Sequence, residues 1–159
     1  MITEHQIERT AQQLSDDHTE IEPWLRRVET EQPHLLAYLT SDAFGILTEA
    51  EQELLLYAAT IIYETVRREA PQTALIPEDD IGAVEERNWE RIESSSARTF
   101  REKLDVFFRD IPQEDLLAFA EDLLLPPAEE DDESDDLTPE GRELIFVGLA
   151  TVIEVLTTN

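Results

Sequence analysis

Residues 48–70, TEAEQELLLYAATIIYETVRREA, contain the stretch that decides the fold. Residues 54–63 carry apolar side chains on nearly every side of a helix, and Thr48 followed by Glu51 is the pattern of a capping box. A helix that is apolar nearly all round belongs in the interior of a bundle. We therefore expect a long central helix that begins at Thr48 and ends before Pro71, since proline interrupts helical hydrogen bonding.

Residues 138–157, TPEGRELIFVGLATVIEVLT, form a second segment of this kind. Thr138 is a suitable N-cap and Pro139 suits the first turn, so we expect a helix from Glu140 to about Leu156. Strand signals are nearly absent, because the chain has only four glycines and no alternating run beside a hairpin turn. Further helices are expected over residues 4–14, 19–30, 34–39, 81–109 and 112–126. The run Ser94-Ser95-Ser96 weakens the helical pattern within 81–109, so a kink or a break there is the alternative to one continuous helix.

The chain contains a weak internal repeat. Residues 32–38, QPHLLAY, align with residues 113–119, QEDLLAF, at an offset of 113 − 32 = 81. Leu47-Thr48 aligns with Leu137-Thr138 at an offset of 137 − 47 = 90. The additional nine residues coincide with the acidic segment 128–136, AEEDDESDD, as an insertion in a loop would. The alternative is chance similarity between leucine-rich amphipathic helices.

These patterns predict an all-α fold, a compact bundle of about six or seven helices in a single domain over residues 1–159. The two pseudo-repeated halves would cover about 32–70 and 113–157, with their long apolar helices packed together at the centre. Residues 128–136 have seven acidic side chains in nine positions, so we expect a mobile loop there.

The chain is strongly acidic, with 38 acidic and 12 basic residues and a formal net charge of −26. Such a charge repels nucleic-acid phosphates and anionic lipids, which argues against direct binding of nucleic acid or a membrane. Three explanations stay open: adaptation to high salt, a docking surface for a basic partner, or mimicry of DNA. With no long apolar run and no signal peptide, the sequence suggests a soluble, cytoplasmic protein.

The sequence lacks the residues that many catalytic mechanisms require. There is no cysteine for a disulfide, a thiolate nucleophile or a thiolate metal ligand. No serine lies in a Gly-x-Ser-x-Gly elbow, and no glycine-rich loop is available to hold phosphates. We therefore expect no cofactor and lean away from an enzyme.

Four glutamates occupy a narrow polar strip on the two long apolar helices, at Glu53, Glu64, Glu143 and Glu154. Carboxylates that face one another inside a bundle can act as the ligands of a di-metal site. A metal-dependent enzyme is therefore one alternative function. The other interpretation is that the strip faces water or pairs with arginine, and Arg68 lies four residues after Glu64.

Five arginines form a stripe if residues 81–109 are one continuous helix, at Arg87, Arg91, Arg98, Arg101 and Arg109. The stripe either pairs with acidic groups of the same molecule or contacts another subunit, which would produce a homo-oligomer. Our main expectation for function is a non-catalytic protein–protein interaction or scaffold module. An acidic DNA-mimic inhibitor is a further alternative.

Overall fold

The computed structural model describes residues 2–16, 21–69, 74–94, 99–124 and 138–157. These residues form helices and their connections without any strand, so the predicted all-α bundle is confirmed. The elements, in chain order, are α1 (Glu4–Asp16), α2 (Ile21–Glu31), α3 (Pro33–Leu39), the 3-10 turn η1 (Asp42–Phe44), α4 (Glu49–Glu69), α5 (Glu78–Glu93), α6 (Phe100–Lys103), α7 (Asp105–Asp110), α8 (Glu114–Leu124) and α9 (Pro139–Thr157). The acidic segment 128–136 lies outside the described residues.

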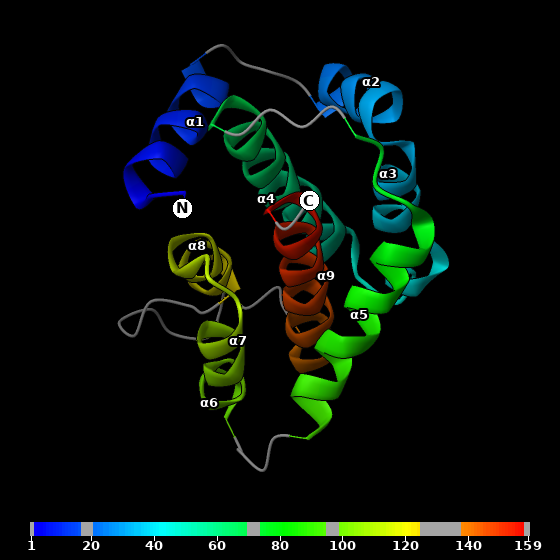
Figure 1. Cartoon of the computed structure of the whole chain (residues 1–159), viewed down its shortest axis with the longest axis vertical. Helices are drawn as coiled ribbons and strands as arrows, with labels where there is room; N and C mark the ends of the chain where they lie inside the picture. Colours follow the sequence, from blue (N-terminus) through cyan, green and yellow to red (C-terminus); the bar gives the residue numbers. More distant parts are fainter. Residues whose placement is uncertain (1, 17–20, 70–73, 95–98, 125–137, 158–159) are drawn as a thin grey trace.

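Helix α9 is the centre of the bundle. It packs against α4, α5 and α8, and Figure 1 shows it between α5 on one side and α7 and α8 on the other. Each residue from Leu144 to Leu156 is buried, which removes a long apolar surface from water. Although α9 is so apolar, no helix in the described ranges combines the length and apolarity that a membrane span needs.

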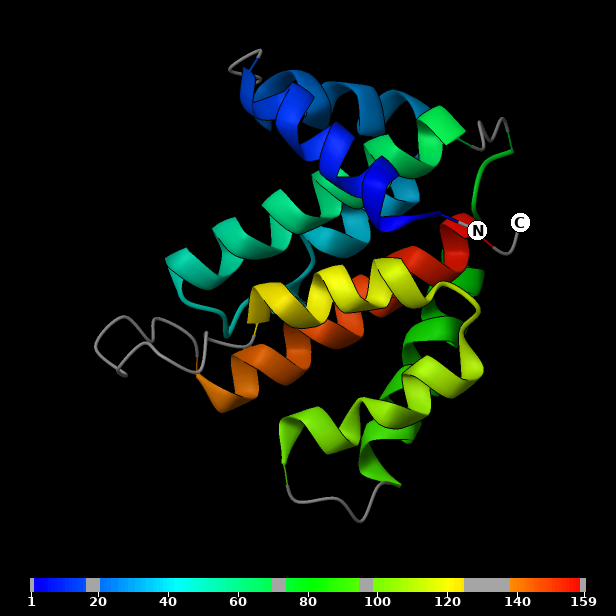
Figure 2. The ribbon, with the colours of Figure 1, turned by 90° about the vertical axis from the view of Figure 1, so that its left-hand side faces the viewer.

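Helix α4 is only partly central. Residues 58–66 are all buried, as the apolar pattern predicts. The first half instead exposes one side to solvent, where Tyr57 is 48% exposed. Figure 2 shows this half extending to the edge of the molecule. The expectation of an interior position therefore holds for the second half of α4 and is wrong for the first.

One carboxylate caps both long helices. The predicted capping box is present, because Glu51 N donates to Thr48 Oγ1 (3.1 Å) and Thr48 N donates to Glu51 Oε1 (2.9 Å). The other oxygen, Glu51 Oε2, accepts hydrogen bonds from Thr138 N (2.8 Å) and Thr138 Oγ1 (3.0 Å). Thr138 Oγ1 in turn accepts from Gly141 N (2.9 Å), as an N-cap does. The starts of α4 and α9 are thus joined through one buried side chain.

Two glycines of α9 make room for this packing. A Cβ at Gly141 would lie under 3.0 Å from both carboxylate oxygens of Glu51. A Cβ at Gly148 would lie 2.9 Å from the ring of Phe44 in η1, so this glycine admits an aromatic ring next to α4. Gly141 and Gly148 occupy the repeat positions of Glu51 and Ala58, and the duplication itself stays a prediction.

Residues 81–109 do not form one continuous helix, and the first helix ends directly before Ser94, where the sequence left a kink or a break open. Helix α5 begins earlier, at Glu78, and ends at Glu93, while α6 and α7 are separate short helices. Ser94 stands at the C-cap, where its hydroxyl bonds to the carbonyl of Arg91. Serine competes for backbone hydrogen bonds in this way and weakens helices. This division accounts for the larger number of helices in the described residues than the six or seven expected.

Candidate functional site

The four glutamates of the predicted strip lie in separate surroundings. Glu53 is exposed, and the other three each bind a basic side chain. Glu64 pairs with Arg27 of α2 at 2.5 Å, a partner that sequence spacing did not indicate. Across the described part of the chain, no group of three or more histidine, aspartate or glutamate residues is placed to hold a metal ion.

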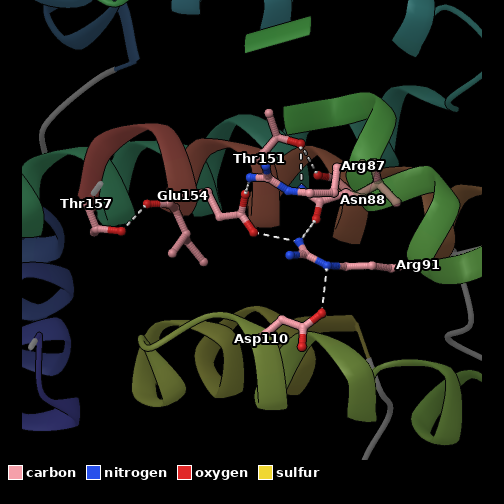
Figure 3. A network of polar contacts seen from close by, with 9 residues as sticks. Arg87, Asn88, Arg91, Asp110, Thr151, Glu154 and Thr157 are labelled. Atoms are coloured by element: carbon pink, nitrogen blue, oxygen red, sulfur yellow. Dashed lines mark hydrogen bonds and ion pairs between the residues drawn. The ribbon is translucent and has the colours of Figure 1, made fainter. Parts of the chain in front are cut away.

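Glu154 is the centre of a polar network that joins α5, α7 and α9 (Figure 3). Its side chain is 5% exposed, and it accepts hydrogen bonds from Arg87 Nη2 at 2.7 Å and Arg91 Nη1 at 2.6 Å. A buried carboxylate needs such compensation, because burial removes its favourable hydration. The two arginines come from α5, so this network attaches α5 to α9.

Arg91 also joins α5 to α7. Its Nε donates to Asp110 Oδ2 at 3.2 Å, and its guanidinium lies 5.8 Å from the ring centre of Phe107. Asn88 accepts a hydrogen bond from Arg91 and donates one to Thr151 Oγ1 at 3.1 Å. Arg91 therefore has several partners within its own chain.

The predicted arginine stripe does not form one row. Arg87 and Arg91 turn toward Glu154, as the intramolecular alternative requires. Arg98 lies outside the described residues, and the side chain of Arg101 is not among those described. Arg109 is exposed on α7. The stripe depended on a continuous helix, and the end of α5 at Glu93 separates its members.

A different charged feature covers the outer face of α5. Four exposed carboxylates lie there, at Asp79, Glu86, Glu90 and Glu93. At about 100° per residue these positions fall within about 60° of one another. Buried Ile81, Asn88 and Ile92 face the opposite way. With a rise of about 1.5 Å per residue, this row, which we name the acidic ridge, is about 21 Å long.

The acidic ridge was not singled out from the sequence, although its spacing is visible there. Residues 85–109, counted as one segment, carry six acidic and six basic side chains, so a count over this segment does not indicate an acidic face on α5. The structure separates the two signs: Arg87 and Arg91 reach toward α9, while the acidic ridge faces solvent. A count of charge by helix face, rather than by segment, would have revealed the ridge.

An open cleft of about 750 Å³ lies between the C-terminal end of α5 and the α6–α7 pair. The described residues that line it are Arg91, Ser94, Glu102, Lys103, Asp105, Val106 and Arg109. This volume is in the range of small-molecule binding sites. The lining is mostly charged.

The remaining ionisable cluster, on α2 and α4, is tightly paired. Glu31 Oε1 accepts hydrogen bonds from Tyr63 Oη (2.6 Å) and Arg67 Nε (3.2 Å). Burial opposes ionisation of Glu31, but these hydrogen bonds outweigh it and hold its pKa below the usual value. Burial and the nearby Glu31 carboxylate raise the pKa of Tyr63. At neutral pH the pair is thus fixed as carboxylate and phenol, which does not suit general acid–base catalysis.

No protein-family model, curated protein or solved structure matches this chain. The arrangement of its own residues therefore carries the functional argument.

Proposed function

We propose that this protein is a non-catalytic helical module that binds a basic protein partner through its acidic surface, with the acidic ridge of α5 as part of the contact. The observation that carries this proposal is the separation of charge on α5. Its two arginines pair with Glu154 of α9, and no ion pair joins the ridge carboxylates to a basic side chain that the structure describes. A row of unneutralised carboxylates attracts a basic surface and accelerates encounter with it.

The same geometry favours a separate basic protein over a second copy of this chain. A homo-oligomer through the predicted stripe would place its arginines on the acidic ridge of another copy, whereas Arg87 and Arg91 already bind Glu154 of their own molecule. A metal-dependent enzyme gains no support from Glu53, Glu64, Glu143 and Glu154, which do not converge in the described structure. A cytoplasmic location is part of this proposal.

The test measures whether binding is localised to the acidic ridge. A fluorescein-labelled nine-arginine peptide serves as the basic probe, and its affinity is measured by fluorescence anisotropy at low ionic strength. The ridge variant carries Glu86→Gln, Glu90→Gln and Glu93→Gln. A control variant carries Glu4→Gln, Glu8→Gln and Asp122→Asn, three exposed residues on α1 and α8, and has the same net charge.

We expect the ridge variant to bind the peptide at least about tenfold more weakly than the wild type, and the control variant to lose about threefold or less. Circular dichroism checks that both variants keep their helices. Equal losses of affinity in the two variants would refute the proposal, because the peptide would then respond only to the net charge of the protein and not to the position of the carboxylates. That result is the one expected of an acidic surface that serves adaptation to salt.

A DNA mimic would also bind a basic protein, but this alternative function has an additional requirement. The partner of a DNA mimic must bind DNA, so duplex DNA must displace this protein from it. The three exposed glutamates of the ridge that lie closest together, Glu86, Glu90 and Glu93, are the residues whose neutralisation should abolish that competition.

A further inference from the structure

An apolar stripe of α4 is buried at one end and exposed at the other. Four apolar residues share this side of the helix, within about 60° of one another, at Ala50, Leu54, Tyr57 and Ile61. Ile61 is 1% exposed, whereas Tyr57, about one turn earlier, is 48% exposed, and Ala50 is exposed as well. An apolar stripe on a helix normally faces a packing partner. We name its exposed part, Ala50, Leu54 and Tyr57, the α4 face.

Polar contacts from α1 and α2 fix the other half of α4. Gln6 Nε2 of α1 donates to Glu69 Oε2 at 2.8 Å, and Arg27 of α2 pairs with Glu64 at 2.5 Å. Figure 1 shows the C-terminal end of α4 between α1 and α2. The α4 face precedes these contacts along the helix, in the half that Figure 2 shows extending to the edge of the molecule.

The α4 face has acidic surroundings, which determine the kind of partner it suits. Residues 35–66 contain five acidic side chains and no lysine, arginine or histidine. Glu49 and Glu53 are exposed on the adjoining side of the helix. A second copy of this chain would add its own charge of −26, so repulsion opposes self-association. The face also rises only about 10 Å along the helix, which is short for the roughly 800 Å² that each partner buries in a stable dimer.

We propose that the α4 face binds an amphipathic helix of the basic partner. The apolar side chains of that helix cover Tyr57 and Leu54, and its lysines or arginines meet Glu49 and Glu53. This inference rests on the proposed function and gives the same partner a second contact, on a different helix from the acidic ridge. An amphipathic helix that lays its apolar side on an apolar surface is a recurring mode of recognition. Covering the exposed half of a tyrosine, about 100 Å², adds an attraction that charge alone does not provide.

The experiment compares two fluorescein-labelled basic peptides on the full chain by fluorescence anisotropy. One is LKKLLKLLKKLLKL, which as a helix is apolar on one side and basic on the other. The second is the nine-arginine peptide, which has no apolar side chain. The face variant is Tyr57→Gln. Its matched control is Leu75→Gln, because Leu75 is a similarly exposed apolar residue (51% exposed) outside α4.

We expect Tyr57→Gln to weaken binding of the leucine–lysine peptide about tenfold and binding of the nine-arginine peptide by less than about twofold. Leu75→Gln should change neither affinity by more than about twofold. The double variant Glu49→Gln/Glu53→Gln should weaken binding of the leucine–lysine peptide about threefold, since it removes two carboxylates beside the face. Circular dichroism checks that the variants keep their helices.

The other outcomes overturn this proposal. If Tyr57→Gln and Leu75→Gln have the same effect on the leucine–lysine peptide, the α4 face does not bind it, while a loss of affinity confined to the acidic-ridge variant would leave the proposed function standing. If Tyr57→Gln weakens both peptides equally, it acts through the fold and not through an apolar contact. If light scattering gives a dimer that Tyr57→Gln converts to a monomer, a second copy occupies the face. If the ridge variant and Tyr57→Gln both match their controls, both proposals fail.

Discussion

Replacing Gly141 with alanine should destabilise the protein, although alanine is the better helix former. An alanine Cβ would lie under 3.0 Å from both carboxylate oxygens of Glu51, a distance that real Cβ atoms essentially never show. The carboxylate cannot move away freely, because Thr48 N and both donors of Thr138 hold it. The substitution must therefore displace Glu51 and weaken the cap that the two long helices share.

Two opposing effects determine the magnitude. Alanine gains about 1 kcal/mol over glycine inside a helix. Displacing Glu51 weakens three hydrogen bonds to an ionised group, each worth about 1.5–3 kcal/mol, and we take about half of that total as lost. The expected net loss for Gly141→Ala is therefore about 2 kcal/mol, or roughly 4–8 °C in the melting temperature of a chain of this size.

A double-mutant cycle with Glu51→Ala isolates this contact. Without the carboxylate the Cβ at position 141 has free space, so Gly141→Ala should then stabilise the protein by about 1 kcal/mol. Gly82 on α5 is the matched control, since a Cβ there would meet nothing within 4 Å. Gly82→Ala should stabilise both backgrounds equally. Urea unfolding followed by circular dichroism measures all of these variants. The reasoning is refuted if Gly141→Ala has the same effect with and without Glu51.

Two further predictions concern the carboxylates that accept hydrogen bonds within the bundle. The free energy of unfolding should fall as the pH drops below about 4.5, the usual pKa of glutamate. Glu31 and Glu51 have lowered pKa values in the folded state, so their contribution is complete above the unfolded pKa and is lost as the pH falls through the folded pKa. Thermal melts between about pH 3 and 7 check this, and an unchanged slope in Glu51→Gln would contradict it. Glu154→Gln should cost about 3 kcal/mol in urea unfolding, because it leaves Arg87 and Arg91 without their carboxylate. Glu140→Gln, exposed on the same helix, should change stability by less than about 0.5 kcal/mol, and a similar small value for Glu154→Gln would show that the network is unimportant.

Local signals in the sequence predicted the helices well. The capping box at Thr48 and Glu51, the N-cap at Thr138 and the start of α3 at Pro33 all depend on residues within one turn of each other. The apolar runs likewise identified the two long helices. Helix class and helix starts are therefore set by short-range patterns in this chain.

The links between helices could not be read in the same way. Glu51 was expected to cap only its own helix, and its bonds to Thr138, 87 positions away, depend on how α4 and α9 pack. Gly141 leaves room for this carboxylate, but a glycine in the sequence does not by itself indicate that a distant side chain packs against it. Similarly, Arg68 was the local candidate to pair with Glu64, whereas Arg27 supplies the ion pair and Arg68 contacts Gln13.

The same difference between local patterns and contacts between helices applies to the candidate site. The sequence identified Arg87 and Arg91 as charged residues on one helix, but the direction of their side chains depends on the position of Glu154 in α9. The predicted arginine stripe also required residues 81–109 to be one helix, although the sequence left a break at Ser94-Ser95-Ser96 open. Once α5 ends at Glu93, the cleft between it and the α6–α7 pair becomes possible.

Ion pairs within the bundle occupy many of the basic side chains. The sequence has only 12 basic residues, and among those that the structure describes, Arg27, Arg67, Arg87, Arg91 and Lys103 are in ion pairs with acidic groups of the bundle. Two of those acidic groups, Glu64 and Glu154, are buried and cannot give up their partners without a large loss of stability. Because the chain has 38 acidic and only 12 basic residues, exposed carboxylates such as those of the acidic ridge carry an excess of negative charge. Mobile ions would neutralise the exposed carboxylates uniformly over the surface. A basic partner would neutralise them at one place, so only a partner would make the acidic ridge different from the rest of the surface.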